Sequence, residues 1–348
     1  MCLENHSVKT KVSIPLHTVY RSFVWPVELA TSTAYLIAEV PSMATAIAER
    51  LLARPGDWPP ASPNARCAAE AFDNLLELIA DGSAAAAAQG RTFADAGGIR
   101  AVVALLDETA MDIGRRAVNL DTSNQRDVQM LMMLGDVQSM GCTLLSNLAA
   151  FAGVEAGGET AISDELKISN SMAAVVTSLR LYPDSPEHVE AGLAALTQIL
   201  PIDPRSFLTT GAHELTVKIM LSQKATTWPL YLCARAIMRC TDFGDVPKDA
   251  LRQVGAATAL QHALSAPPGD PNCGREWGVA DVPAKLKEVA KAALEALAVP
   301  GEVDGGVGCG GGGSGDEAGG AHFCRANLPL GLAVACVASA AALWHMRA

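Results

Sequence analysis

The sequence predicts an all-α fold built from repeated groups of helices. Half of the 348 residues are hydrophobic but only 5% are aromatic, and alanine and leucine dominate the apolar set. Both residues favour helices. No long stretch alternates polar and apolar residues with the Val, Ile and Thr typical of strands. The length fits two ordinary domains or one extended array of repeats.

One helical pattern recurs along the chain. Its clearest copy is MGCTLLSNLA at 140–149, where Gly141 is followed by leucines three, four and seven positions later. The copies begin at Ala68, Gly141, Gly192, Cys233 and Ala290. The apolar positions fall on one face of a helix. The small first residue would let a neighbouring helix approach closely.

A second pattern precedes four of these copies. It is centred on residues that tolerate a left-handed backbone, namely Gly97, Asn170, Gly211 and Gly255. Four positions before them lie Phe93, Leu166, Phe207 and Leu251, and nine positions after them lie Leu106, Leu179, Met220 and Leu264. Each unit is therefore predicted to contain a short helix, a sharp turn, a second helix and a long third helix.

These stretches resemble the armadillo repeat, most clearly in DAGGIRAVVALLD (95–107), MGCTLLSNLA (140–149) and MAAVVTSLRLYPDSPEHVEAGLAALTQIL (172–200). They are also similar to the armadillo-type modules of leucine-rich-repeat kinases. The resemblance implies an armadillo-type right-handed helical-repeat solenoid of about four to five units with degenerate ends. A simple Ala- and Leu-rich bundle would give some of these matches. The agreement of three offsets around four hinges favours the repeat.

The repeats suggest a division of the chain. The expected parts are an N-terminal segment or cap (1–40), the repeat domain (41–299), a Gly-rich linker (300–325) and a candidate transmembrane helix (326–346). Two polar insertions, 107–127 and 266–283, interrupt the repeat domain and are expected to be long loops, mobile rather than functional.

The C-terminal segment carries no charge between Arg325 and His345. As a helix, residues 328–344 would rise about 25 Å, close to the hydrocarbon thickness of about 30 Å. Behind a flexible linker, this segment resembles a tail anchor that would leave the repeats in the cytosol. The alternative is a cytoplasmic protein whose C-terminal helix packs on the repeats.

The sequence contains no motif for catalysis or cofactor binding. A phosphate-binding loop and a zinc-protease HExxH motif are absent. Cys309, His322 and Cys324 match no zinc spacing, and the scattered cysteines fit a reducing compartment. A net charge of −11 argues against nucleic-acid binding. We expect no enzyme activity, cofactor, metal or small-molecule substrate.

A binding site is predicted on the third helices. The resemblance implies that these helices line a concave groove, in which asparagines bond the backbone of an extended peptide. The sixth position after each start holds Asn74, Asn147, Gln198 and Arg239, whereas Ala296 departs from the polar series. Thr143 stands where nuclear-import armadillo proteins have Trp, which argues against nuclear-signal recognition. Alternatively, these side chains bond locally along their helices.

The resulting hypothesis is a non-enzymatic scaffold that binds a protein or peptide in this groove and is held at a membrane by residues 326–346. The alternative is a soluble cytosolic armadillo adaptor or co-chaperone-like protein. An enzyme using Cys or His residues of the two insertions is a third, less favoured hypothesis.

Overall fold

The computed structural model describes residues 44–49, 51, 64–80, 82–118, 124–154, 160–222, 226–267, 279 and 281–298. All of them belong to one unit of the chain, residues 41–348. Within these residues every regular element is a helix.

The helices form repeated triplets. The first helices are α4 (Ala84–Asp95), α7 (Ala161–Ile168), α10 (Pro204–Thr209) and α13 (Asp245–Gln253). The second helices are α5 (Gly98–Val118), α8 (Ser171–Leu181), α11 (Ala212–Met220) and α14 (Ala256–Ser265). The third helices are α3 (Asn64–Ile79), α6 (Gln125–Val154), α9 (Pro186–Ile199), α12 (Thr227–Thr241) and α15 (Val282–Leu297), of which α3 precedes the first complete triplet.

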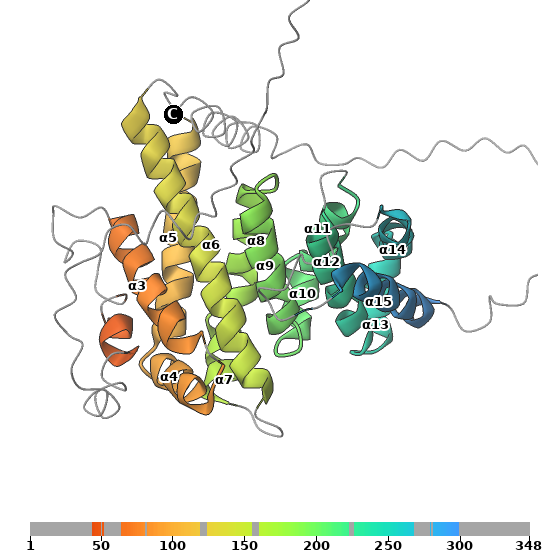
Figure 1. Ribbon diagram of the computed structural model, residues 1–348, viewed down its shortest axis with the longest axis horizontal. Helices are drawn as coiled ribbons and strands as arrows, with labels where there is room; N and C mark the ends of the chain where they lie inside the picture. The colour runs from red at the N-terminus through yellow and green to blue at the C-terminus, as the bar shows by residue number, and fades with distance from the viewer. Residues whose placement is uncertain are drawn as a thin grey trace, which may run out of the picture. The chain divides into compact units, whose positions relative to one another are not determined.

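Equivalent helices pack side by side. Each third helix contacts the next, in the order α3, α6, α9, α12 and α15, and the second helices α5, α8, α11 and α14 also follow one another. Figure 1 shows this succession along the chain. The arrangement confirms the predicted armadillo-like repeat, because each triplet contacts mainly its neighbours.

The predicted hinges are confirmed. Gly97, Asn170, Gly211 and Gly255 all have positive φ, between 60° and 79°. Each separates the first helix of its unit from the second. The large residues four positions earlier, Phe93, Leu166, Phe207 and Leu251, are all buried. The left-handed turn therefore folds the short first helix back so that this side chain enters the core.

The recurring apolar pattern is also confirmed. The five starting residues are buried, and so are the apolar residues three and seven positions later. At the fourth position, Phe72, Leu145, Leu196 and Ile237 are completely buried, while Leu294 is partly buried. These side chains form one continuous core along the third helices.

The first insertion differs from its prediction as a long loop. Residues 107–118 continue α5, which is 21 residues long, and 125–127 begin α6, which is 30 residues long. Ala110, Ile113 and Ala117 are buried on the inner face of this extension. Their helical spacing was concealed in the sequence by the charged residues between them.

Several predictions fall outside the described residues: the segment 1–40, most of the second insertion (266–283), the linker 300–325 and the candidate membrane segment 326–346. Cys309, His322 and Cys324 also lie outside them. Among the helices that are described, none combines the length and hydropathy needed to span a bilayer.

Candidate functional site

The four predicted groove residues occupy equivalent places on successive third helices. Asn74 on α3 is exposed, and Asn147 on α6, Gln198 on α9 and Arg239 on α12 are partly buried. We call these four residues the polar column. Each is followed in sequence by a completely buried residue: Leu75, Leu148, Ile199 or Cys240. The buried residues thus fix which face of each third helix points to the core. The residue at the sixth position consequently lies at the surface.

Asn147 has an uncommitted amide. Its side chain makes no hydrogen bond with any residue that the structure describes. One turn earlier, Thr143 donates instead to the carbonyl oxygen of Ser139, 3.1 Å away on the same helix. The Asn147 amide therefore keeps both donor and acceptor capacity for a ligand.

Gln198 and Arg239 contact each other across neighbouring units. Nη1 of Arg239 donates to the carbonyl oxygen of Thr197 and lies 3.4 Å from Oε1 of Gln198. The second contact orients the Gln198 amide, because a guanidinium can only donate and must face the amide oxygen. The amide nitrogen of Gln198 is then the group left for a ligand.

A second arginine lies one turn from Arg239. Arg235 precedes it by four residues on α12, and its positive charge contributes to lowering the pKa of Arg239, after burial, which is the larger cause. Tyr231 and Asp242 act in the opposite direction. Among the described residues, neither arginine forms an ion pair. On the same helix, Tyr231 stacks on Trp228 with ring centroids 5.4 Å apart.

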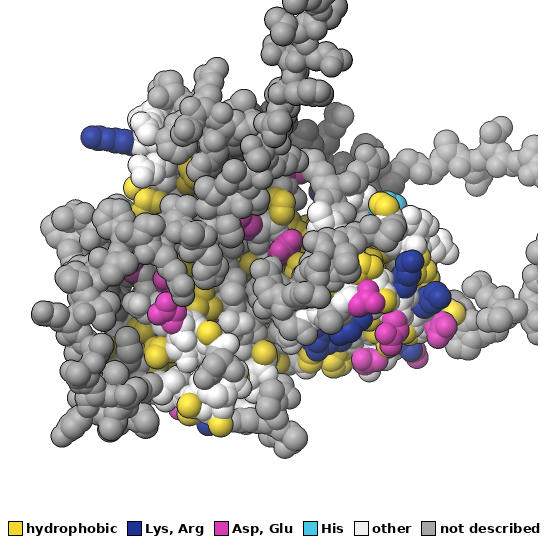
Figure 2. All heavy atoms as spheres, viewed as in Figure 1, with side chains coloured by type: hydrophobic (Ala, Val, Ile, Leu, Met, Phe, Trp, Pro, Cys, Tyr) yellow, Lys and Arg dark blue, Asp and Glu magenta, His cyan; other side chains and the backbone are white. Residues whose placement is uncertain are grey.

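One face of the protein carries a group of charged side chains. In Figure 2, side chains of both signs gather around α13 and α15. Lys285, Lys287 and Lys291 on α15 are exposed there, as is Glu288. A mixed surface of this kind is typical of solvated helices. Arg235 and Arg239 on α12 differ from it because they are partly buried.

A histidine contact that the sequence analysis missed joins two units. Nε2 of His188 at the start of α9 is 2.9 Å from the carbonyl oxygen of Gly135 on α6, and Nδ1 is 2.8 Å from Oγ of Ser185. Because a carbonyl only accepts, Nε2 carries the proton and Nδ1 accepts from the Ser185 hydroxyl. The ring stacks on Tyr182 at a centroid distance of 4.1 Å.

Burial is the main cause of the shifted pKa values of His188 and Tyr182. Burial lowers the pKa of His188, and the hydrogen bond to Gly135 opposes this shift. Burial also raises the pKa of Tyr182, assisted by the nearby Asp136 carboxylate. The neutral imidazole therefore links α6 and α9 through its hydrogen bond to Gly135. The only signal in the sequence was Ser185 three residues before His188, a spacing that places both in the first turn of a helix.

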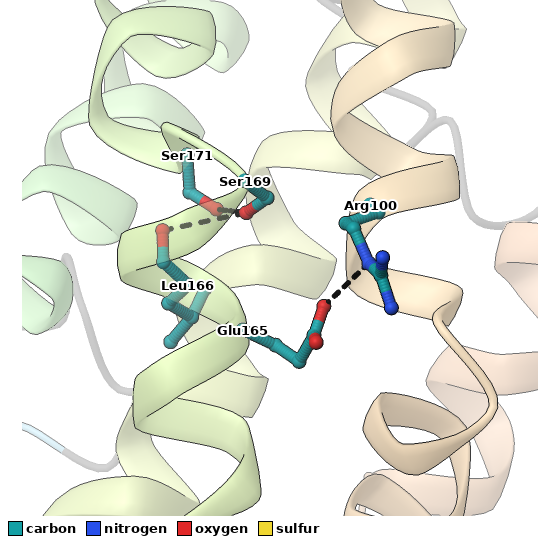
Figure 3. A network of polar contacts seen from close by, with 5 residues as sticks. All are labelled: Arg100, Glu165, Leu166, Ser169 and Ser171. Atoms are coloured by element: carbon teal, nitrogen blue, oxygen red, sulfur yellow. Dashed lines mark hydrogen bonds and ion pairs between the residues drawn. The ribbon is translucent and has the colours of Figure 1, made fainter.

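Figure 3 shows three other polar contacts, made by residues of α5, α7, the turn that follows α7 and the start of α8. Nε of Arg100 on α5 donates to Oε2 of Glu165 on α7 at 2.9 Å, which links the first and second complete triplets. Beside Asn170, the hydroxyls of Ser169 and Ser171 are 2.8 Å apart, and Ser169 also donates to the Leu166 carbonyl oxygen at 3.3 Å. These bonds stabilise the turn and offer no site for chemistry.

Three buried cysteines, Cys142, Cys233 and Cys240, are poor nucleophiles. Burial raises the pKa of Cys142 to about 11 and that of Cys240 to about 12, and it also raises the pKa of Cys233. A nucleophilic thiol needs the opposite shift, since the thiolate is the reactive form. Cysteine chemistry at these three positions is therefore disfavoured.

Comparison with known proteins gives structural similarity alone. No protein-family model matches the sequence, and no curated protein matches it. A solved structure of the designed armadillo repeat protein YIII(Dq)4CqI is 20% identical; the match covers 75% of this chain and 100% of that protein, with a TM-score of 0.40. A computationally designed armadillo repeat protein for modular peptide recognition is 19% identical, with coverages of 74% and 99% and a TM-score of 0.40.

An engineered protein of the Northeast Structural Genomics Consortium is also similar. It is 18% identical, and the match covers 74% of this chain and 96% of that one with a TM-score of 0.42. The armadillo-like fold assigned to this chain follows from its own helix triplets and left-handed hinges.

Proposed function

We propose that the chain is a non-enzymatic binding scaffold whose polar column holds an extended segment of a protein partner. The observation that supports this proposal is that Asn74, Asn147, Gln198 and Arg239 repeat on adjacent third helices and stay at the surface. An extended peptide cannot satisfy its own backbone groups, so a row of fixed side-chain donors and acceptors suits it.

The spacing of packed helices supports the same proposal. Neighbouring helix axes lie about 8–10 Å apart. An extended chain advances about 3.3 Å per residue, so it would meet the next member of the column about every third residue. The amides of Asn147 and Gln198 would then bond backbone groups, and the side chains between these contacts would supply sequence preference.

The experiment is a selection of binding peptides from a random library displayed on phage, followed by affinity measurements on the purified chain of 348 residues. The test variant combines Asn147→Ala with Gln198→Ala. The matched control combines Gln253→Ala with Gln261→Ala, which removes two exposed amides from α13 and α14, outside the polar column.

We expect the selected peptides to bind the control as they bind the original protein, and to bind the test variant about tenfold or more weakly. This loss corresponds to about 1 kcal/mol for each hydrogen bond removed. Circular dichroism would confirm that both variants keep their helices. Equal binding by both variants, or a library that yields no binding peptide, would overturn the proposal.

We also propose that residues 326–346 attach the scaffold to a membrane. This second proposal is supported by the uncharged sequence between Arg325 and His345. Cell fractionation with an alkaline carbonate wash would compare the full chain with a version ending at Ala321. Retention of the full chain alone supports attachment. Release of both supports the alternative adaptor, whose C-terminal segment packs on the repeats.

A further inference from the structure

We infer that the partner segment carries an acidic side chain where it passes α12, and that Arg239 and Arg235 bind its carboxylate. This inference rests on the proposed function, because it specifies the partner chemistry of the same polar column. It identifies α12 as the part of the surface that selects a side chain, whereas Asn147 and Gln198 meet the peptide backbone.

The geometry of Arg239 supports a carboxylate ligand. Its Nη1, which lies on the Cδ side of the guanidinium, is occupied by the Thr197 carbonyl and by Oε1 of Gln198. The Nε–Nη2 edge bonds no described residue. That edge presents two parallel N–H groups, the arrangement that binds both oxygens of a carboxylate. Because Thr197 and Gln198 on α9 already hold the guanidinium in place, the Arg239 side chain loses little conformational entropy when a ligand binds.

The charges around α12 support the same ligand. Arg235 and Arg239 are four residues apart on one helix, a spacing at which like charges repel. Arg239 is partly buried, which lowers its pKa. The Asp242 carboxylate raises this pKa but forms no ion pair with Arg239. In a chain of net charge −11, these two partly buried arginines form no ion pair with any described residue. A carboxylate placed between the two guanidinium groups would remove the repulsion.

A singly charged carboxylate fits this place better than a phosphate. Asp242 adds a negative field beside Arg239, and the overall acidity of the chain opposes a doubly charged ligand more strongly than a singly charged one. The rest of the polar column offers no further cation, since Asn147 and Gln198 are neutral. We therefore expect one acidic position per peptide rather than a run of them.

Three pools of fluorescein-labelled peptides would test this inference. All would be about twelve residues long and degenerate in small and apolar residues, with one fixed central residue: Glu, Gln or phosphoserine. Fluorescence polarisation at about 150 mM salt would measure binding to the full chain. The variants are Arg235→Gln, Arg239→Lys and, as a control that matches the charge change of Arg235→Gln, Lys285→Gln on α15.

We expect the Glu pool to bind about tenfold more tightly than the Gln pool, as suits charge-assisted hydrogen bonds. Arg235→Gln should reduce this preference without removing any hydrogen bond between helices. Arg239→Lys should reduce it further, because lysine keeps the charge but lacks the two-donor edge. The α15 control should keep the full preference.

Each other outcome has a distinct meaning. If the Glu and Gln pools bind equally well, the acidic preference is wrong and the peptide scaffold stands. If the phosphoserine pool alone binds, the ligand is a phosphate and the inference is overturned. If no pool binds, the scaffold proposal fails as well. Loss of the preference in the α15 control would attribute it to overall charge and reject the α12 site.

Discussion

Gly192 on α9 lies directly against Leu179 on α8. A Cβ built on Gly192 would be 2.6 Å from both Cγ and Cδ2 of Leu179. The preceding unit repeats this relationship, since a Cβ on Gly141 would be 2.6 Å from Cδ2 of Leu106 and 3.2 Å from its Cγ. The starting residue of a third helix thus makes room for the leucine nine positions after the hinge of the same unit.

Gly192→Ala is expected to destabilise the protein by about 1–3 kcal/mol, because the added methyl group overlaps a buried side chain. Gly141→Ala should cost less, since Cδ2 at the end of Leu106 is the one atom of the described residues within 3.0 Å of the Cβ position there. Urea unfolding followed by circular dichroism would measure both. In combination with Leu179→Ala, the cost of Gly192→Ala should shrink. A Gly192→Ala variant as stable as the original protein would contradict the packing described above.

Gly255→Ala should cost about 1–2 kcal/mol for a different reason. No atom lies within 4 Å of the position a Cβ would take, but φ is +79°, where an alanine is strained. Gly255→Asn should cost less, because asparagine tolerates this conformation and occupies the equivalent hinge at position 170 with φ of 60°. Equal destabilisation by both substitutions would indicate that strain at the hinge is not the cause.

His188 should make stability fall on mild acidification. Burial holds its folded-state pKa below the unfolded value of about 6.5, so the unfolded chain binds a proton first as the pH drops. Stability from this group is complete above pH 6.5 or so and is lost progressively below it. Urea midpoints between about pH 5 and pH 7.5 should vary less in His188→Gln than in the original protein. Parallel curves would contradict this assignment.

Gln138 on α6 is a buried polar side chain whose contribution to stability can be tested. It is completely buried, and its Nε2 lies 2.6 Å from both the Leu106 carbonyl oxygen and Oγ1 of Thr109. Its Oε1 has no partner among the described residues. Both groups that it contacts have other bonds, because Thr109 donates to Leu105 and Leu106 accepts from Thr109.

Gln138→Met should therefore change the free energy of unfolding by less than about 1 kcal/mol, because it removes an unsatisfied oxygen and leaves no new one. Gln138→Glu should cost about 3 kcal/mol or more at neutral pH, since it buries an unpaired carboxylate. Chemical unfolding of both variants would measure the difference. Equal costs would mean that shape rather than polarity determines the effect at this position.

Much of the fold could be predicted because it depends on local repetition. The hinge at Asn170 was recognisable because asparagine tolerates a left-handed backbone and because Leu166 and Leu179 lie at the recurring spacings before and after it. Its φ of 60° confirms the hinge. The helical extension of α5 was missed although Ala110, Ile113 and Ala117 have helical spacing, because charged residues fill the positions between them. Periodicity therefore predicted the helices better than overall polarity did.

The candidate site was less predictable because its contacts cross between units. The sequence placed Gln198 and Arg239 in one column but gave no indication that they contact each other, since this depends on how α9 and α12 are offset. The bond between His188 and the Gly135 carbonyl was likewise unpredictable, because residues 53 positions apart meet only after the units stack. The peptide-binding role of the column stays a prediction.

The interface between α9 and α12 is smaller than those between α6 and α9 and between α12 and α15. In a stacked array, cooperativity of unfolding is lost first at the weakest junction, so the chain should melt as two blocks divided there. Arg239 bridges this junction through Thr197 and Gln198. A partner that binds the same side chains would stabilise the junction between the two blocks. Ligand binding would therefore make the two blocks unfold together.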